Sequence, residues 1–145
     1  TTPPRALILG AGKGLGSELA ETLRRRGTRT IEVGSSLDDL RYSEDRLTMH
    51  CDLASPESVR SLFERLRDAP RFTAFWWVAG IWRKGEFADH PTYDLVRMID
   101  VNFRNALPIV QYAWQMMRTE TAPQSFVIVS STSGVQPRDH EVAYT

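Results

Sequence analysis

The residues able to do chemistry lie near the two ends of this sequence. Towards the carboxyl end, Ser131 follows the apolar run Phe126–Val129, and Tyr144 comes thirteen residues after Ser131. A serine hydroxyl can hold an alcohol or carbonyl oxygen, and a tyrosine hydroxyl can transfer a proton. Towards the amino end, glycines follow the apolar run Ala6–Leu9. The first pattern suits a hydroxyl–carbonyl redox reaction, and the second suits the binding of a dinucleotide.

The glycine-rich loop reads Leu9-Gly10-Ala11-Gly12-Lys13-Gly14-Leu15-Gly16. Glycines permit a tight turn and allow phosphate oxygens to approach the backbone. The helix that follows offers unpaired N–H groups and roughly +0.5 charge at its N-terminus, which favours a diphosphate. The loop is not a P-loop, because Gly14 rather than Ser or Thr follows the lysine. The alternative is a purely structural turn, but the place after a first strand favours a dinucleotide.

Strand-like and helix-like segments alternate along the whole chain. This alternation predicts an α/β fold, a Rossmann-like doubly wound parallel sheet with strand order 3-2-1-4-5. Ligands of such sheets bind at the carboxyl ends of the strands, where the glycine loop, Ala79-Gly80 and the serine-rich turn would meet. The predicted strands are Ala6–Leu9, Thr30–Val33, Leu47–Cys51, Phe72–Val78 and Ser125–Ser130.

Three helices are predicted between these strands. Leu15, Leu19 and Leu23 recur at helical spacing, and Gly27 closes that helix. Ser55-Pro56 is a helix cap followed by proline in the first turn. A long helix is expected from Thr92 to about Arg118, with a kink at Pro108, which lacks an amide donor.

The spacing of Gly10, Gly14 and Gly16 resembles the short-chain dehydrogenase/reductase family, and so does the Ser131–Tyr144 frame. The resemblance covers the whole chain, although Leu9 replaces the family's threonine. It implies that Ser131 orients the substrate oxygen, that Tyr144 transfers the proton and that Asn102 supports a water or proton relay. Within the family, Asp52-Leu53 matches the pair that contacts the adenine.

Two departures from the family pattern stand out. Trp77-Val78 replaces the family's asparagine pair before Ala79-Gly80, so the usual side-chain support of the central sheet is in doubt. The family's lysine would occupy position 148, beyond Thr145. Lowering a tyrosine pKa from ~10 to ~7 needs about 4 kcal/mol of differential stabilisation, more than one hydrogen bond supplies.

The end of the second strand, Val33–Ser36, carries hydroxyls and no acid. An acid there would bind the ribose 2′-hydroxyl of NAD, whereas hydroxyls and a nearby cation accommodate the 2′-phosphate of NADP. Lys13 matches the basic loop position of the family's NADP-using members. We therefore expect NADP(H), with NAD as the alternative. The predicted cofactor contacts are Gly10, Lys13, Gly14, Leu15, Gly16, Ser35, Asp52, Leu53, Ala79 and Gly80.

These patterns predict an NADP-dependent oxidoreductase that interconverts an alcohol and a ketone or aldehyde. One rival is a non-catalytic NADP-binding sensor or interaction module, favoured by the missing lysine and by Trp77-Val78. A nucleotide-free scaffold is a third interpretation. Because members of the family run to roughly 250 residues, we expect the 145 residues to be one NAD(P)-binding domain truncated at its carboxyl end.

Composition excludes several other classes of function. The net charge is zero, which argues against a nucleic-acid partner. The single Cys51 forms no intrachain disulfide, and the three histidines have no metal-ligand spacing, so no metal is expected. No run approaches the ~18 apolar residues of a membrane span. We expect a cytoplasmic protein, and we expect the long helix from Thr92 to favour a homo-oligomer.

Overall fold

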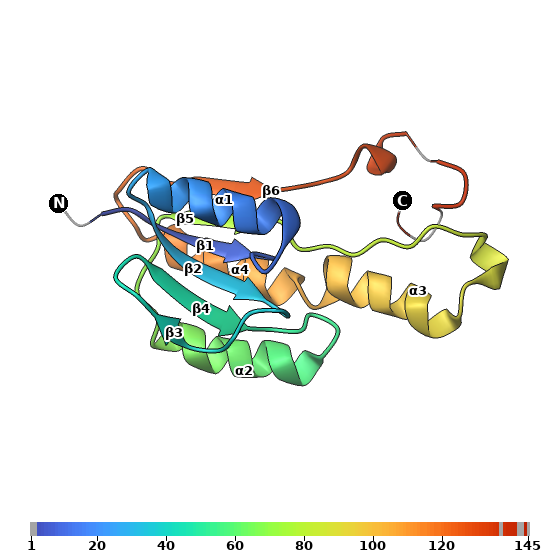
Figure 1. Ribbon diagram of the computed structural model, residues 1–145, viewed down its shortest axis with the longest axis horizontal. Helices are drawn as coiled ribbons and strands as arrows, with labels where there is room; N and C mark the ends of the chain where they lie inside the picture. Colours follow the sequence, from blue (N-terminus) through green and yellow to red (C-terminus); the bar gives the residue numbers. More distant parts are fainter. Residues whose placement is uncertain (1–2, 137, 142–143, 145) are drawn as a thin grey trace.

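The fold is built on one six-stranded sheet in which every neighbouring pair is parallel except the pair at one edge (Figure 1). The computed structural model describes residues 3–136, 138–141 and 144. The strand order is β3-β4-β2-β1-β5-β6. The strands are β1 (Arg5–Leu9), β2 (Arg29–Gly34), β3 (Arg41–Tyr42), β4 (Arg46–His50), β5 (Ala74–Trp77) and β6 (Ser125–Ile128).

The predicted order of the five parallel strands is confirmed, and one strand was missed. That strand, β3, contains two residues and pairs antiparallel with β4, Arg41 lying opposite Thr48. Two residues are too few to produce the alternation of apolar and polar side chains that marks a longer strand. At the opposite edge, β6 pairs only with β5 in the described part of the chain.

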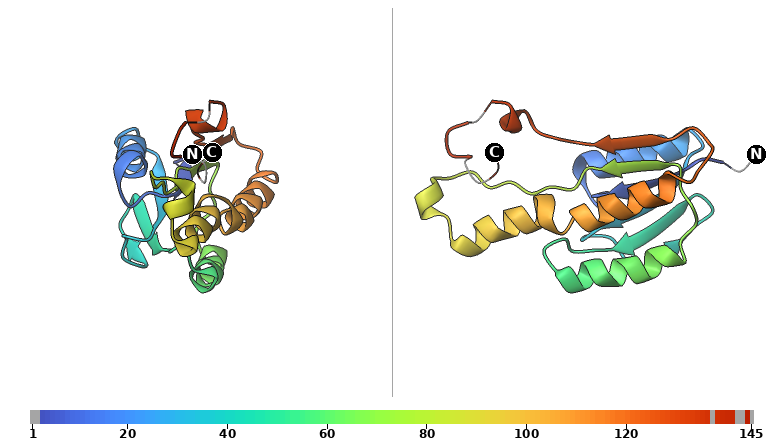
Figure 2. Two further views of the ribbon diagram at one scale, coloured as in Figure 1. Left: turned by 90° about the vertical axis from the view of Figure 1, so that its right-hand side faces the viewer. Right: turned by 180° about the vertical axis from the view of Figure 1, so that it is seen from behind.

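Helices cover both faces of the sheet, as the doubly wound prediction requires. Helix α1 (Gly14–Arg25) lies on one face, and α2 (Pro56–Arg67) and α4 (Leu107–Met117) lie on the other (Figure 1). Helix α3 (Thr92–Ile99) extends beyond the carboxyl ends of the strands (Figure 2). The edge of the sheet at which the strands end therefore lies between α1 on one side and α3 on the other.

Helix α1 approaches the sheet through small residues. Gly16 and Ala20 are its buried positions, and Leu19 and Leu23 pack partly against the small cluster around Ala6 and Ile8. The row of leucines predicted for this helix is thus only partly packed against the core, because Leu15 is 63% exposed. Its exposure leaves the side chain available at the edge of the sheet.

The predicted start of α2 is confirmed in detail. The Ser55 hydroxyl accepts a hydrogen bond from the Ser58 amide at 3.2 Å, and Pro56 occupies the first turn. These two features satisfy one exposed amide and remove another at the helix start. Val59, Leu62 and Leu66 are buried on the side of α2 that faces the sheet.

The single long helix predicted from Thr92 is wrong in one respect. It is divided into α3, a π-helical segment (Asp100–Arg104) and α4. The Asn105 amide bonds to the Asp100 carbonyl at 2.9 Å, five residues back, which is the π pattern. Pro108 lies in the first turn of α4, where a missing amide costs little, so the break precedes the proline.

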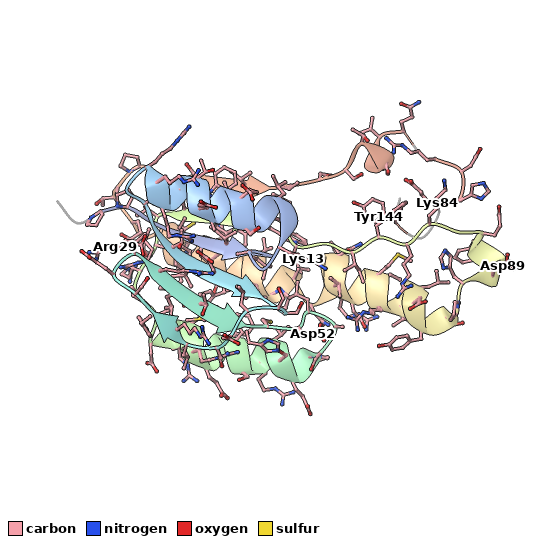
Figure 3. All side chains as sticks on the ribbon, in the orientation of Figure 1. Lys13, Arg29, Asp52, Lys84, Asp89 and Tyr144 are labelled. Atoms are coloured by element: carbon pink, nitrogen blue, oxygen red, sulfur yellow. The ribbon has the colours of Figure 1, made fainter. Side chains whose placement is uncertain are left out.

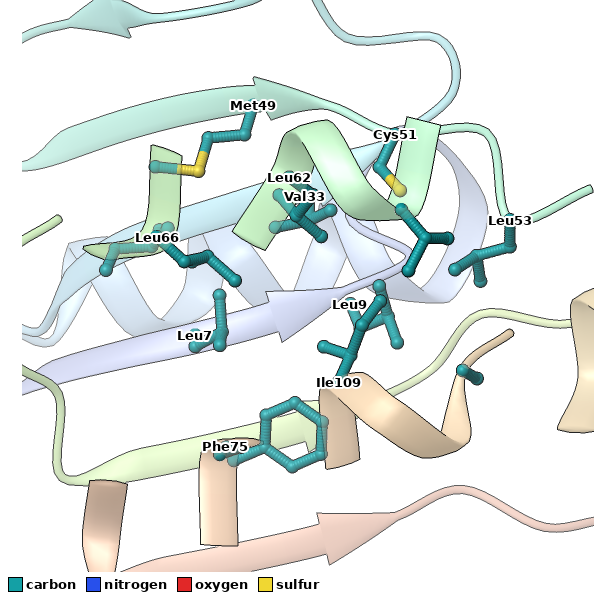
Figure 4. Packing of buried hydrophobic residues seen from close by; sticks show 14 of the residues in the cluster. Leu7, Leu9, Val33, Met49, Cys51, Leu53, Leu62, Leu66, Phe75 and Ile109 are labelled. Atoms are coloured by element: carbon teal, nitrogen blue, oxygen red, sulfur yellow. The ribbon is translucent and has the colours of Figure 1, made fainter. Parts of the chain in front are cut away.

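The strands align so that their carboxyl ends meet near Lys13 and Asp52, away from Arg29 at the start of β2 (Figure 3). The main core lies between the sheet and helices α2 and α4, where Leu7, Leu62 and Phe75 are buried (Figure 4). This packing holds the turns after the strands in fixed positions. Within the described residues, none of the helices has the length and apolar character needed to cross a membrane.

Candidate functional site

A cleft of about 490 Å³ lies at the carboxyl ends of β1, β2, β4 and β5. It is formed by the glycine loop, the turns after these strands and one side of α3. All ten residues predicted to contact a cofactor lie in its lining, while their contact with a cofactor stays a prediction. These residues are Gly10, Lys13, Gly14, Leu15, Gly16, Ser35, Asp52, Leu53, Ala79 and Gly80.

Two glycines of the loop are required by close packing of backbone on backbone. A Cβ atom at Gly16 would lie 1.9 Å from the Gly10 carbonyl oxygen, and one at Gly10 would lie 2.4 Å from the Ala79 nitrogen. Gly10 also has a φ of 98°, which side-chain-bearing residues rarely adopt. These contacts bring the start of α1 directly against the ends of β1 and β5.

The N-terminus of α1 is open towards the cleft. Lys13 is the N-cap residue, no side chain caps the first turn, and the first turn contains no acid. A Cβ at Gly14 would meet no atom within 4 Å. Uncovered amides at a helix start, beside a lysine and in open space, fit the diphosphate of a dinucleotide.

The end of β2 supplies hydroxyls rather than a carboxylate. Ser35 and Ser36 are exposed, and a Cβ on Gly12 would lie 2.3 Å from the Ser36 hydroxyl oxygen. Asp38 and Asp39, which come next, form ion pairs with arginines outside the cleft lining. Among the described lining residues Asp52 is therefore the single acid, and the β2 end can receive a phosphate.

The turn after β4 is fixed by its own hydrogen bonds. The Asp52 carboxylate accepts a bond from the Ala54 amide at 2.9 Å, and the Asp52 amide donates to the Ser58 hydroxyl at 2.9 Å. The Leu53 carbonyl accepts a bond from the Asn105 side-chain amide at 2.7 Å. Beside them, burial raises the pKa of the Cys51 thiol to about 11, so this thiol is neutral at physiological pH.

The turn after β5 is supported by two side chains. The Trp77 indole N–H donates to the Ala79 carbonyl at 3.0 Å, so this turn retains a side-chain hydrogen bond despite the Trp77-Val78 departure. The Asn102 side chain binds the backbone of Ile81, accepting from its amide at 2.7 Å and donating to its carbonyl at 2.8 Å. Asn102 thus lies directly next to the cleft.

Ser131 and Tyr144 lie outside the cleft lining. The Ser131 hydroxyl accepts a bond from the Ser133 amide at 3.2 Å, and the Tyr144 amide donates to the Glu141 carbonyl at 2.9 Å. Tyr144 lies on the stretch of chain beyond the strand ends (Figure 3). Among the contacts of the described residues, no hydrogen bond joins the side chains of Asn102, Ser131 and Tyr144.

Several lining residues are absent from the list of predicted cofactor contacts. They include Gly12, Ser36, Ile81, Arg97 and Val101. Helical periodicity offered one signal, since Arg97 and Val101 are four residues apart on the helix that carries Asn102. No group of three histidines, cysteines or acids in the described part of the chain could hold a metal ion.

Comparison with known proteins agrees with this geometry. The profile of the family described as short chain dehydrogenase matches residues 4–145. The chain belongs to the short-chain dehydrogenase family. A search of the curated proteins returns no match. The NAD(P)-binding Rossmann fold of the family is therefore the fold of this chain.

Solved structures of short-chain dehydrogenases superpose closely. A short chain dehydrogenase family protein from Francisella tularensis has a TM-score of 0.82 at 17% identity, covering 99% of this chain and 57% of that protein. ElxO with NADP bound gives 0.81 at 19% identity, covering 99% and 61%. The 3-oxoacyl-[acyl-carrier protein] reductase from Brucella melitensis, in complex with NAD, gives 0.79 at 21% identity, covering 99% and 62%.

The chain spans 57–62% of the length of these three relatives. At such identities the likeness shows the fold alone. The two relatives with cofactors named differ in the dinucleotide they hold, NADP in one and NAD in the other. The choice between these cofactors must therefore be argued from the residues of this chain.

Proposed function

We propose that this chain is the dinucleotide-binding part of an NADP(H)-dependent oxidoreductase that interconverts an alcohol and a ketone or aldehyde. The observation that carries the proposal is the cleft itself, in which an uncapped helix start, Lys13 and the Ser35 and Ser36 hydroxyls converge. Family membership provides the expectation of redox chemistry. When bound, the cofactor would supply the hydride that reduces a carbonyl or accept the hydride that an alcohol loses.

The preference for NADP rests on charge around the β2 end. The carboxylates that follow Ser35 and Ser36 in sequence are Asp38 and Asp39, and both pair with arginines. Lys13 has no ion pair among the described residues. A 2′-phosphate at this end would meet hydroxyls and one ammonium group without a facing carboxylate.

In the proposed reaction Ser131 holds the substrate oxygen by a hydrogen bond, and Tyr144 exchanges the proton with that oxygen as acid or base. Asn102 stabilises the turn after β5 through its bonds to Ile81. The substrate is a small carbonyl or alcohol compound. The proposal thus assigns proton transfer to the carboxyl end and cofactor binding to the first four parallel strands.

The test uses the purified protein that contains this chain. Binding of NADPH and NADH is measured by cofactor fluorescence, and turnover is measured with a broad panel of ketones and aldehydes. We expect tighter binding of NADPH, carbonyl-dependent oxidation of NADPH, and loss of that oxidation in Tyr144→Phe with cofactor binding unchanged. Lys13→Ala should weaken NADPH more than NADH, and an unchanged NADPH preference would contradict the cofactor assignment.

A second candidate function is a non-catalytic NADP-binding sensor or interaction module. The observation that favours it is the position of Ser131 and Tyr144 outside the cleft lining, with the Ser131 hydroxyl bonded to the Ser133 amide. This candidate predicts NADPH binding without turnover of any carbonyl. Turnover that depends on Tyr144 would exclude it.

We further propose that the protein assembles as a homo-oligomer. Apolar side chains are exposed along α3, the π-helical segment and α4, among them Tyr93, Phe103 and Trp114. A groove of about 500 Å³ between α4 and β6 is lined mainly by such side chains. Sedimentation velocity at micromolar concentration tests this expectation, and a monomer at all concentrations would contradict it.

A further inference from the structure

Arg97 is a cation in the cleft that the predicted cofactor contacts do not include. It lies on α3, is half-buried, and lines the cleft together with Ile81 and Val101. Its one described hydrogen bond is long, from the guanidinium to the Tyr93 hydroxyl at 3.4 Å. It is the single arginine among the described lining residues.

The carboxylates nearest to Arg97 on its own helix are already paired with other arginines. Asp94, three residues before it, pairs with Arg83 at 3.6 Å. Asp100, three residues after it, pairs with Arg104 at 2.9 Å. Within the described part of the chain Arg97 therefore has no ion-pair partner, although helical spacing places two carboxylates within its reach.

The side of the helix that carries Arg97 faces the turn after β4. Arg97, Val101 and Asn105 follow one another in steps of four residues. Asn105 binds the Leu53 carbonyl at 2.7 Å, and Val101 is buried in the same core cluster as Leu53. Arg97 is the outermost of the three, because α3 extends away from the sheet towards its N-terminus (Figure 2). It therefore lies at the rim of the cleft on the Asp52-Leu53 side.

We propose that Arg97 is a purine-binding residue, whose guanidinium covers the adenine ring of the dinucleotide at the Asp52-Leu53 turn. A guanidinium is planar, weakly hydrated and well suited to stacking on a flat aromatic ring. In the proposed function the phosphates bind at the α1 N-terminus and Lys13, which belong to the glycine loop and not to α3. The inference rests on the proposed function, because it assumes that the cleft binds an adenine dinucleotide.

The experiment separates stacking from simple charge attraction. Dissociation constants for NADPH are measured by fluorescence for the full protein and for Arg97→Lys and Arg97→Met. Lysine keeps the charge without the planar group, and methionine keeps an unbranched stem without charge. Arg104→Met is the matched control, since Arg104 is an exposed, paired arginine outside the cleft lining. Circular dichroism confirms that each variant is folded.

We expect both Arg97 variants to weaken NADPH binding by about tenfold, which lies between the values for an exposed and a fully desolvated cation–π contact. Adenosine, which has no phosphate, should lose the same factor when it displaces NADPH. Reduced nicotinamide mononucleotide, which has no purine, should bind the variants as it binds the unaltered protein. Arg104→Met should bind all three ligands normally.

The proposal is overturned if Arg97→Lys binds NADPH normally while Arg97→Met does not, because binding would then need only a positive charge and not the planar guanidinium. Equal losses for the mononucleotide, or no loss for adenosine, would overturn it too. Failure of the unaltered protein to bind NADPH would refute the proposed function and this inference together. Binding without carbonyl turnover would refute the catalytic proposal alone and leave the role of Arg97 standing.

Discussion

Asn102 binds both polar groups of Ile81, accepting from its amide at 2.7 Å and donating to its carbonyl at 2.8 Å. The two bonds join the π-helical segment to the turn after β5. Three residues later, Asn105 joins the same helical stretch to the turn after β4 through the Leu53 carbonyl. Two asparagines thus connect one helix to two walls of the cleft, and the π-helical geometry lets them face different turns.

Replacing Asn102 by alanine should lower both stability and cofactor affinity. Two partly buried backbone groups would lose their partners, which costs about 1–3 kcal/mol in the free energy of unfolding. Urea denaturation and NADPH fluorescence measure the two effects. Gln124→Ala is the matched control, because Gln124 also binds backbone carbonyls, at 2.7 and 2.8 Å, but outside the cleft lining. An equal loss of NADPH affinity in both variants would argue against a specific role for Asn102.

Gly16→Ala should be strongly destabilising. The new methyl group would lie 1.9 Å from the Gly10 carbonyl oxygen, which is backbone and cannot rotate away. We expect a loss of about 3 kcal/mol or more, at the upper end of overpacking effects, together with loss of NADPH binding. Gly134→Ala is the control, since a Cβ there meets no atom within 4 Å and should change stability by about 0.5 kcal/mol at most. Equal denaturation midpoints for the two variants would contradict the close packing of the loop.

Glu32→Ala should destabilise the sheet far more than removal of an exposed acid. Glu32 is buried in β2 and pairs with Arg24 and with Arg46, the latter at 2.8 Å. Breaking a buried pair by removing one partner costs about 3–5 kcal/mol. The exposed Glu21–Arg25 pair is the comparison, because Glu21→Ala should cost about 0.5 kcal/mol or less. Urea denaturation of both variants measures the two losses in the free energy of unfolding. A small loss for Glu32→Ala would mean that Arg24 and Arg46 find other partners.

The Cys51 thiol should make stability fall in alkaline solution. Its folded pKa is raised by burial to about 11 from an ordinary value of 9.0, so folding favours the neutral thiol. The contribution of the neutral thiol to the free energy of unfolding is complete below about pH 9 and is lost as the pH rises towards 11. Over that range the free energy of unfolding falls by up to about 1.4 kcal/mol per pH unit. Cys51→Ala should flatten that part of the stability profile measured by urea denaturation. An unchanged profile would show that the thiol does not titrate with unfolding.

The sheet could be predicted from the sequence because each parallel strand is a short apolar run bounded by turn residues. Strand β1 illustrates this, with Ala6 to Leu9 buried on both faces. The break after Ile99 could not be predicted. The apolar positions continue at helical spacing through it, and the π-helical insertion depends on tertiary bonds such as that between Asn105 and Leu53. Proline was a misleading signal, since Pro108 is tolerated within the first turn of α4.

The cofactor side of the site could be predicted because its glycines and turns lie directly after strands. The topology of the sheet alone brings these turns together at the carboxyl ends of the strands. Arg97 was missed because it lies within a helix, away from the turns that directly follow the strands. Ser131 and Tyr144 were placed by resemblance, and the structure locates them outside the cleft lining. Their relation to the cleft depends on the path of the chain after β6, which local sequence patterns do not specify.

The two edges of the sheet are chemically different. The edge at β3 is two residues long and carries Arg41 and the exposed Tyr42, and a short, charged edge resists further pairing. The edge at β6 is longer and exposes Ile128. Of the two edges in the described part of the chain, the one at β6 is therefore the better suited to pairing with a further strand. The asymmetry of the edges directs any further strand pairing to the β6 side of the sheet.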